Sequence, residues 1–105
     1  MILAIDFGTT KTLVAYADAG NPRIIHLGRA ASHVPTTVYR QEDGTLLFGE
    51  DADDMGRIDP ANYLRAFKMK LGSPAPVLGK YRAADLVREF LAYLLNLVKQ
   101  DATMH

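Results

Sequence analysis

The residues best suited to chemistry stand in one short run near the start of the sequence, residues 6–11 (DFGTTK). Asp6 closes a nearly uniformly apolar stretch, and a carboxylate buried there would need a partner. In one interpretation Asp6 accepts hydrogen bonds from the turn that follows, as aspartate commonly does beside glycine. In the other, Asp6 faces a hydrated magnesium ion, while the turn amides and the hydroxyls of Thr9 and Thr10 hold phosphate oxygens. The residues alone leave both interpretations open.

Two common phosphate-binding loops do not fit this run. Lys11 and Thr12 match the end of a Walker A motif, but the glycines of that motif are absent and a strand pattern follows where its helix would begin. A dinucleotide-binding Gly-x-Gly-x-x-Gly is also absent. Phosphate binding by a β-hairpin is the chemistry that remains.

The elements that would position this run form an antiparallel meander. Residues 2–7 are short, branched and apolar, which predicts a strand covered on both faces near the centre of a sheet. Residues 11–17 alternate in polarity and predict a second strand, joined to the first by a tight glycine-containing turn. Turn residues then precede a third predicted strand over residues 23–27.

A second hairpin is predicted further along the chain. Residues 34–40 indicate a strand, which Pro35 restricts to a sheet edge or to the start of the strand. Asp43-Gly44 is a strong hairpin signal, and residues 46–48 return after it.

Three helices are predicted after this hairpin. A short one is expected near residues 51–55, and a second over residues 59–72, starting at an Asp-Pro pair and ending at a glycine. Residues 73–76 then serve as a connector. The third helix, residues 83–100, has apolar residues at helical spacing and an unusually broad apolar stripe. The length of 105 residues predicts a single unit. Because few elements remain to cover that stripe, we expect residues 1–105 to be an incomplete domain.

Composition restricts the class of partner. The 105 residues carry twelve basic and twelve acidic side chains, so no broad electrostatic surface for nucleic acid or anionic membranes is expected. The most apolar segment, residues 86–98, is too short to span a membrane. With no cysteine and no leader pattern, a cytoplasmic protein is the expectation.

The order of several motifs resembles one known family. Residues 5–10 (IDFGTT), followed by a strand, resemble the first phosphate motif of the actin-like ATPase superfamily, which includes actin, sugar kinases and the seventy-kilodalton heat-shock chaperones of DnaK type. Three later segments are similar to the chaperones in particular: residues 34–39 (VPTTVY), residues 48–52 (FGEDA), and residues 62–72, which match an Asn…Lys-x-x-aliphatic-Gly helix. The implied fold is α/β, the N-terminal part of an actin-like (ribonuclease H-like) ATPase lobe, with a meander followed by helices.

The resemblance implies roles for individual residues. Asp6 would organise Mg²⁺ through bound water. Aligning Asn62 and Gly72 makes Lys68 the catalytic lysine that reaches the γ-phosphate and helps position the attacking water, with Lys70 as the rival candidate. The residues implied to contact the β- and γ-phosphates of ATP or ADP are Gly8, Thr9, Thr10 and the backbone of Lys11.

Other polar and aromatic residues are given structural roles. No metal-ligand spacing connects the histidines, and we expect surface positions for His26 and His33, as for His105. Tyr63 and Phe67 are expected in the core of the second predicted helix. A group of acidic residues is expected at a helix N-terminus, where negative charge is favoured: Asp51, Asp53 and Asp54.

The resemblance also implies a function for a longer parent protein. That parent would be a chaperone ATPase acting on unfolded peptides with co-chaperones, and the present chain would bind nucleotide weakly and not turn it over. The alternatives from the same superfamily are a sugar or acyl kinase and a bacterial actin-like filament protein. A further hypothesis is that the 105 residues self-associate through exposed helix and sheet edges.

Overall fold

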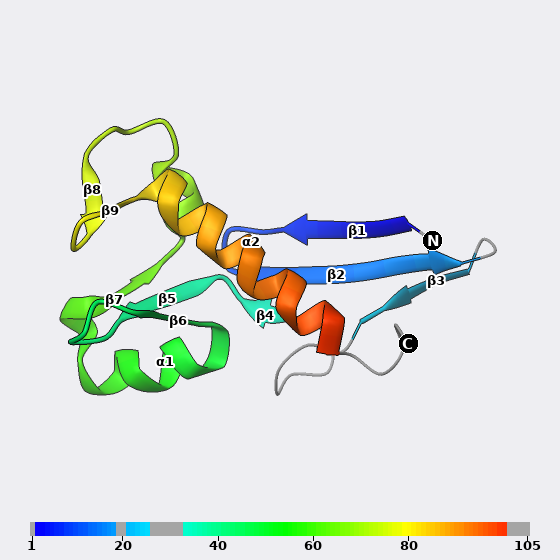
Figure 1. Ribbon diagram of the computed structural model, residues 1–105, viewed down its shortest axis with the longest axis horizontal. Coiled ribbons are helices and arrows are strands. Elements are labelled where there is room, and N and C mark those ends of the chain that lie inside the picture. Colours follow the sequence, from blue (N-terminus) through cyan, green and yellow to red (C-terminus); the bar gives the residue numbers. More distant parts are fainter. Residues whose placement is uncertain (1, 19–20, 26–32, 101–105) are drawn as a thin grey trace.

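The computed structural model describes residues 2–18, 21–25 and 33–100, which form three antiparallel sheets and two α-helices (Figure 1). The first sheet contains β1 (Ile2–Phe7), β2 (Lys11–Asp18), β3 (Asn21–Ile24) and β4 (Val34–Pro35). The second contains β5 (Thr37–Arg40), β6 (Leu46–Phe48) and β7 (Tyr63–Arg65). The remaining elements are the hairpin strands β8 (Pro76–Leu78) and β9 (Tyr81–Arg82), the helices α1 (Gly49–Ile58) and α2 (Ala83–Gln100), and the short 3₁₀ helices η1 (Pro60–Asn62) and η2 (Phe67–Lys70). The α/β class and the antiparallel meander are confirmed.

The prediction that β1 is a covered central strand is wrong. β1 pairs with β2 along one side, with Asp6 opposite Leu13, and has no strand on its other side within the described residues. Leu3 and Ile5 are each 40% exposed, and Asp6 is exposed as well. The residues of β1 are apolar enough to be buried, but at the edge of the sheet they stay partly exposed to solvent. The third strand begins two residues earlier than expected and ends at Ile24, and residues 26 and 27 lie outside the described residues.

The second predicted hairpin is present, with β5 between β6 and β7. At its turn, the carboxylate of Asp43 accepts hydrogen bonds from the Thr45 amide at 3.0 Å and the Thr45 hydroxyl at 2.6 Å. Gly44 has φ of +90°, a backbone conformation that favours glycine. The strand expected over residues 34–40 is interrupted at Thr36, which separates β4 in the first sheet from β5 in the second.

The helix predicted over residues 59–72 is wrong. The segment instead forms η1, β7 and η2, with Tyr63 and Leu64 paired to β5. Ala66 has φ of +55°, outside the right-handed helical region, and directs the chain out of β7 into η2. Strand pairing with β5 therefore overrides the helical spacing of the apolar residues.

The connector expected over residues 73–76 is also wrong in part, because Pro76 already belongs to the β8–β9 hairpin. The hydroxyl of Tyr81 in β9 donates a hydrogen bond to the carbonyl oxygen of Gly44 at 3.0 Å. This contact attaches the hairpin to the turn between β5 and β6.

Helix α2 joins the two larger sheets. Its buried residues recur at helical spacing and pack into one hydrophobic core with both sheets: Leu86, Phe90, Leu94 and Val98. The Phe90 ring lies 5.6 Å from that of Phe7 at the end of β1, 5.7 Å from Phe48 in β6, and 5.7 Å from Phe67 in η2. In Figure 1 the helix runs diagonally across the meander. The predicted helix over residues 83–100 is confirmed.

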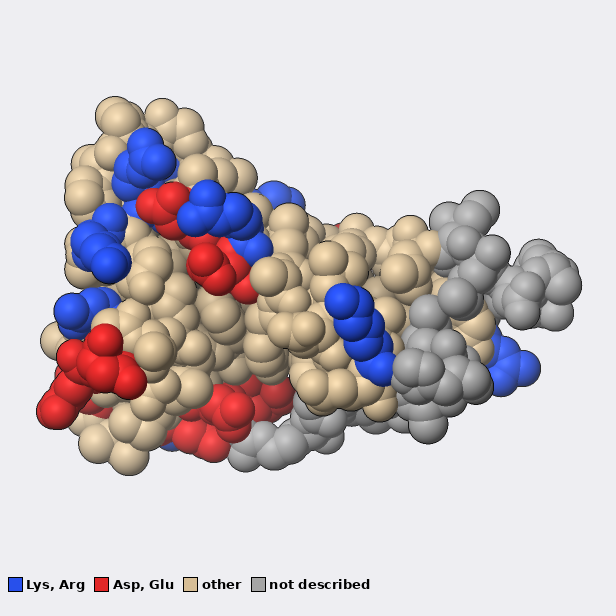
Figure 2. Space-filling model, in the orientation of Figure 1, with Lys and Arg blue, Asp and Glu red and all other residues tan. Residues whose placement is uncertain are grey.

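Charge is mixed rather than segregated on the visible face. Figure 2 shows acidic and basic side chains close together at the end that carries α1, β8 and β9 and over the start of α2, with mostly uncharged surface further towards β1. This pattern agrees with the balanced composition. Within the described residues, neither helix is both long enough and apolar enough to cross a membrane.

Candidate functional site

The turn between β1 and β2 is held closed by its own backbone. The amide of Gly8 donates a hydrogen bond to the carbonyl oxygen of Lys11 at 3.0 Å, which leaves Thr9 and Thr10 at the tip. A Cβ atom at Gly8 would lie only 2.4 Å from that oxygen, closer than carbon and oxygen can approach. Glycine at this position is what allows the turn to be this tight.

A chain of threonine hydroxyls supports the turn from behind. The Thr36 hydroxyl donates to the carbonyl oxygen of Gly8 at 3.0 Å and lies 2.8 Å from the Thr12 hydroxyl. Since a hydroxyl carries one proton, Thr12 is the donor to Thr36. The Thr36 amide also donates to the carbonyl oxygen of Thr10 at 3.0 Å. Both Thr12 and Thr36 are fully buried, so the turn rests on a fixed support.

The outer side of the turn faces solvent. The exposed residues are Asp6, Thr9, Thr10 and Lys11. In the described part of the chain, the amides of Thr9 and Thr10 have no hydrogen-bond partner, and no hydrogen bond joins the Asp6 carboxylate to the turn. The carboxylate is therefore not buried, which corrects the premise that it needs an internal partner, and it does not act as a cap for the turn.

Lys68 reaches the turn from a distant part of the sequence. Its ammonium Nζ donates a hydrogen bond to the carbonyl oxygen of Phe7 at 2.6 Å and lies 5.3 Å from the centre of the Phe7 ring. The contact spans 61 residues. Lys68 is half-buried, whereas Lys70 on the same 3₁₀ helix is exposed. The fold thus places Lys68 beside residues 6–11.

The donor set limits how a metal could be held. Within the described ranges, no three His, Cys, Asp or Glu side chains come together as a metal cluster. One exposed carboxylate, Asp6, fits Mg²⁺, which commonly keeps several waters and binds through one or two carboxylates plus substrate phosphates. The residues present fit such a shared site and do not fit a metal cage made by the protein alone.

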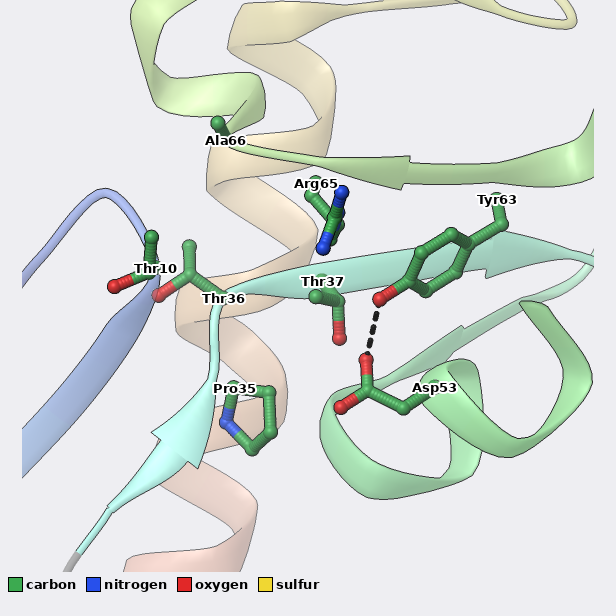
Figure 3. A pocket seen from close by; sticks show the side chains of 8 residues that line it. All are labelled: Thr10, Pro35, Thr36, Thr37, Asp53, Tyr63, Arg65 and Ala66. Atoms are coloured by element: carbon green, nitrogen blue, oxygen red, sulfur yellow. Dashed lines mark hydrogen bonds between the residues drawn. The ribbon is translucent and has the colours of Figure 1, made fainter. Parts of the chain in front are cut away.

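A cleft of about 520 Å³ opens beside the turn (Figure 3). Eight residues line it, from the turn, from β4 to β5, from α1, and from β7 and the residue after it: Thr10, Pro35, Thr36, Thr37, Asp53, Tyr63, Arg65 and Ala66. Thr10 belongs both to this cleft and to the tip of the turn. No sequence motif identifies Arg65, and only its place at the end of the short strand β7 distinguishes it.

Tyr63 and Asp53 form one wall of the cleft. The Tyr63 hydroxyl donates to the Asp53 carboxylate at 2.7 Å, joining β7 to α1. Burial, together with this hydrogen bond and the nearby negative charge, raises the pKa of Tyr63 from 10 to about 12. Tyr63 is half-buried and lines a cleft, which corrects its assignment to a helix core, while Phe67 is fully buried as expected.

The acidic group expected at a helix N-terminus is only partly there. Asp51 lies in the first turn of α1, but Asp53 and Asp54 lie further along it. Asp54 accepts a hydrogen bond from Arg57 at 2.9 Å on the surface. His33 is half-buried rather than on the surface, and residues 26 and 105 lie outside the described ranges.

Comparison with known proteins finds relatives of this chain. No protein-family model matches the chain. Over 106 aligned residues, 33% are identical to those of "Chaperone protein DnaK" from Methanothermobacter thermautotrophicus, an alignment that covers 96% of this chain. The match supports a DnaK-like relationship. The chain spans 17% of the length of that DnaK protein, so the activity of the whole relative does not transfer directly.

Proposed function

We propose that this chain is the first part of the nucleotide-binding domain of a DnaK-type chaperone ATPase, and that residues 6–11 hold the terminal phosphates of Mg-ATP. The observation that carries the proposal is the contact of Lys68 with the end of β1. It puts a half-buried cation next to an exposed turn whose tip amides have no partner in the described structure. The DnaK match supports the same assignment.

The turn is suited to binding phosphate oxygens. Gly8 permits close approach of the backbone, and the free amides of Thr9 and Thr10 point to an anion-binding concavity. The exposed hydroxyls of Thr9 and Thr10 add donors, and the backbone of Lys11 closes the site. Because the buried Thr12 and Thr36 hold the turn in place, little reorganisation is needed to bind an anion.

Two charged side chains complete the proposed phosphate site. A magnesium ion, when bound, neutralises charge on phosphate oxygens. Asp6 would hold that ion through water, consistent with its exposed position and with the absence of a carboxylate cluster in the described residues. The Lys68 ammonium would stabilise charge on the transferred γ-phosphoryl group and orient the attacking water.

Among the superfamily alternatives, the chaperone is favoured. The kinase and filament hypotheses share the first phosphate motif, but a relative that aligns over nearly the whole chain is named a chaperone. Unfolded peptides and co-chaperones are accordingly the proposed partners of a complete protein of this kind. The present chain supplies one side of the phosphate site, so we expect weak nucleotide binding and no turnover.

Calorimetric titration of the chain with Mg-ATP tests the proposal. We compare the wild type with Lys68→Met, which keeps most of the alkyl chain over Phe7 and removes the charge. Loss of one charge-assisted contact predicts about tenfold weaker binding. Lys70→Met is the matched control, since it removes the same charge from the exposed neighbour, and its affinity should stay within about twofold.

Four results would contradict the proposal. Equal affinities for the Lys68→Met and wild-type chains would remove Lys68 from the site, and a loss confined to Lys70→Met would transfer its role to the rival lysine. Submicromolar binding, or ATP hydrolysis by the chain alone, would show that residues 1–105 form a more complete site than proposed.

A further inference from the structure

Arg65 places a cation in the cleft beside the turn. It is exposed at the end of β7, and in Figure 3 its side chain projects among the residues that line the cleft. Within the described part of the chain it forms no ion pair, whereas Arg57, Arg82 and Arg88 each have an acidic partner. An arginine in this state retains its full set of five N–H donors for a ligand.

Most other hydroxyl donors of the cleft are already used. Thr36 donates to the Gly8 carbonyl oxygen, and Thr37 donates to that of Gly49 at 3.0 Å. Tyr63 donates to Asp53. Of the residues that line the cleft, Arg65 and the exposed Thr10 are left with side-chain donors that can serve a ligand, and Thr10 belongs to the tip of the turn.

Asp53 is the one acidic side chain lining this cleft, and it does not neutralise Arg65. Its carboxylate is engaged by Tyr63 at 2.7 Å, and no ion pair to Arg65 is formed. A tyrosine hydroxyl is protonated at neutral pH, so Tyr63 can donate this hydrogen bond there. In Figure 3 Thr10 lies at the side of the cleft away from the Asp53–Tyr63 pair, with Arg65 between them, so the side of the cleft towards Thr10 is the one suited to negative charge.

We propose that Arg65 and Thr10 form an anion subsite in this cleft, which takes a phosphate group of the same polyphosphate ligand that lies on the turn. The inference rests on the proposed function and adds a binding residue to it. Lys68 approaches the turn at Phe7, while Arg65 shares a cleft with Thr10. A polyphosphate with charge on several groups can engage both cations, and the planar guanidinium suits bidentate binding of phosphate oxygens.

The test is a titration of the ¹⁵N-labelled chain with sodium tripolyphosphate and, separately, with Mg-ATP, followed by NMR up to millimolar ligand. The Arg65 Nε–H signal is expected to shift together with the amides of the turn. Arg65→Gln is expected to weaken tripolyphosphate binding about tenfold. Arg88→Gln is the matched control, because it removes the same charge from an exposed arginine on α2, and it should change affinity by less than twofold.

The outcomes separate this inference from the proposed function. If Mg-ATP shifts the turn amides but Arg65→Gln binds both ligands as well as the wild type does, the subsite is overturned and the proposed function stands. If tripolyphosphate binds in an Arg65-dependent manner and Mg-ATP does not bind, the nucleotide assignment fails and the subsite holds. Absence of binding of either ligand overturns both. Amide spectra of each free variant verify the fold, and recovery of affinity by Arg65→Lys would further support a role of charge.

Discussion

Gly8 sets the shape of the turn on which the candidate site depends. Because an added Cβ would lie 2.4 Å from the Lys11 carbonyl oxygen, Gly8→Ala must open the turn or shift β2. We expect a loss of about 1–3 kcal/mol in the free energy of unfolding, as for other overpacked positions. Urea unfolding measures this loss. Thr9→Ala at the exposed tip is the control and should change stability by less than about 0.5 kcal/mol.

The hydroxyl chain behind the turn predicts an order of effects. Thr36 makes two side-chain hydrogen bonds and Thr12 makes one, so Thr36→Val should be the more destabilising, by about 1–3 kcal/mol. The Thr12→Val, Thr36→Val double variant should cost less than the sum of the two, because the pair shares a bond. A double-mutant cycle in urea measures both quantities. Strict additivity would contradict the Thr12–Thr36 hydrogen bond, and a larger effect of Thr12→Val would contradict the assignment of two bonds to Thr36.

Residue-level chemistry of the turn could be inferred from its composition, but its surroundings could not. The run from Asp6 to Lys11 suggested a phosphate-binding hairpin, and the structure shows a tight exposed turn with a supporting lysine. The hydrogen bond by which Thr36 supports the turn spans 28 residues of sequence. The cleft with Arg65 also depends on residues that are far apart in the sequence. Such contacts have no local pattern, and the assignments of ligand roles stay predictions.

At the scale of elements, β7 is joined to α1 through Tyr63 and Asp53, and this link predicts a pH dependence. The unfolded chain releases the Tyr63 proton near pH 10, whereas the folded chain holds it until its pKa of about 12. The unfolding free energy contributed by this group is therefore present below pH 10 and is lost between about pH 10 and 12. Tyr63→Phe should show a shallower decline than the wild type when urea midpoints are compared across that window. Parallel curves would contradict the role of this hydrogen bond.

Local sequence patterns predicted helices and strands correctly where the contacts made in the folded chain favour the same structure. They failed where those contacts favour another structure. The Asp43-Gly44 turn and the α2 periodicity were sufficient because their neighbours reinforce them. Residues 59–72 carry both an N-terminal helix signal and helical spacing of apolar residues. The segment nevertheless forms a strand there, because Tyr63 and Leu64 pair with β5. For β1, the apolar run predicted a strand with neighbouring elements packed over it. The run itself does not show whether the fold places such elements there.

At the scale of the whole molecule, Phe90 joins the two larger sheets through the rings of Phe7 and Phe48, and its ring also contacts that of Phe67 in η2. Phe90→Ala should lower the free energy of unfolding by about 3–5 kcal/mol. Because Phe7 and Phe48 belong to different sheets, signals from both sheets should be lost in the same transition. Leu95→Ala, at a position that is 45% exposed on the same helix, should cost much less. Separate transitions for the two sheets would show that α2 does not couple them.

The central claim is that the turn between β1 and β2 binds the phosphates of Mg-ATP, and an amide-resolved NMR titration of the chain tests it most directly. We predict that the largest shifts fall on the amides of residues 8–11, with a smaller response at Lys68, and that adenosine without phosphates produces neither. Shifts confined to other parts of the chain, or none at millimolar Mg-ATP, would contradict the claim.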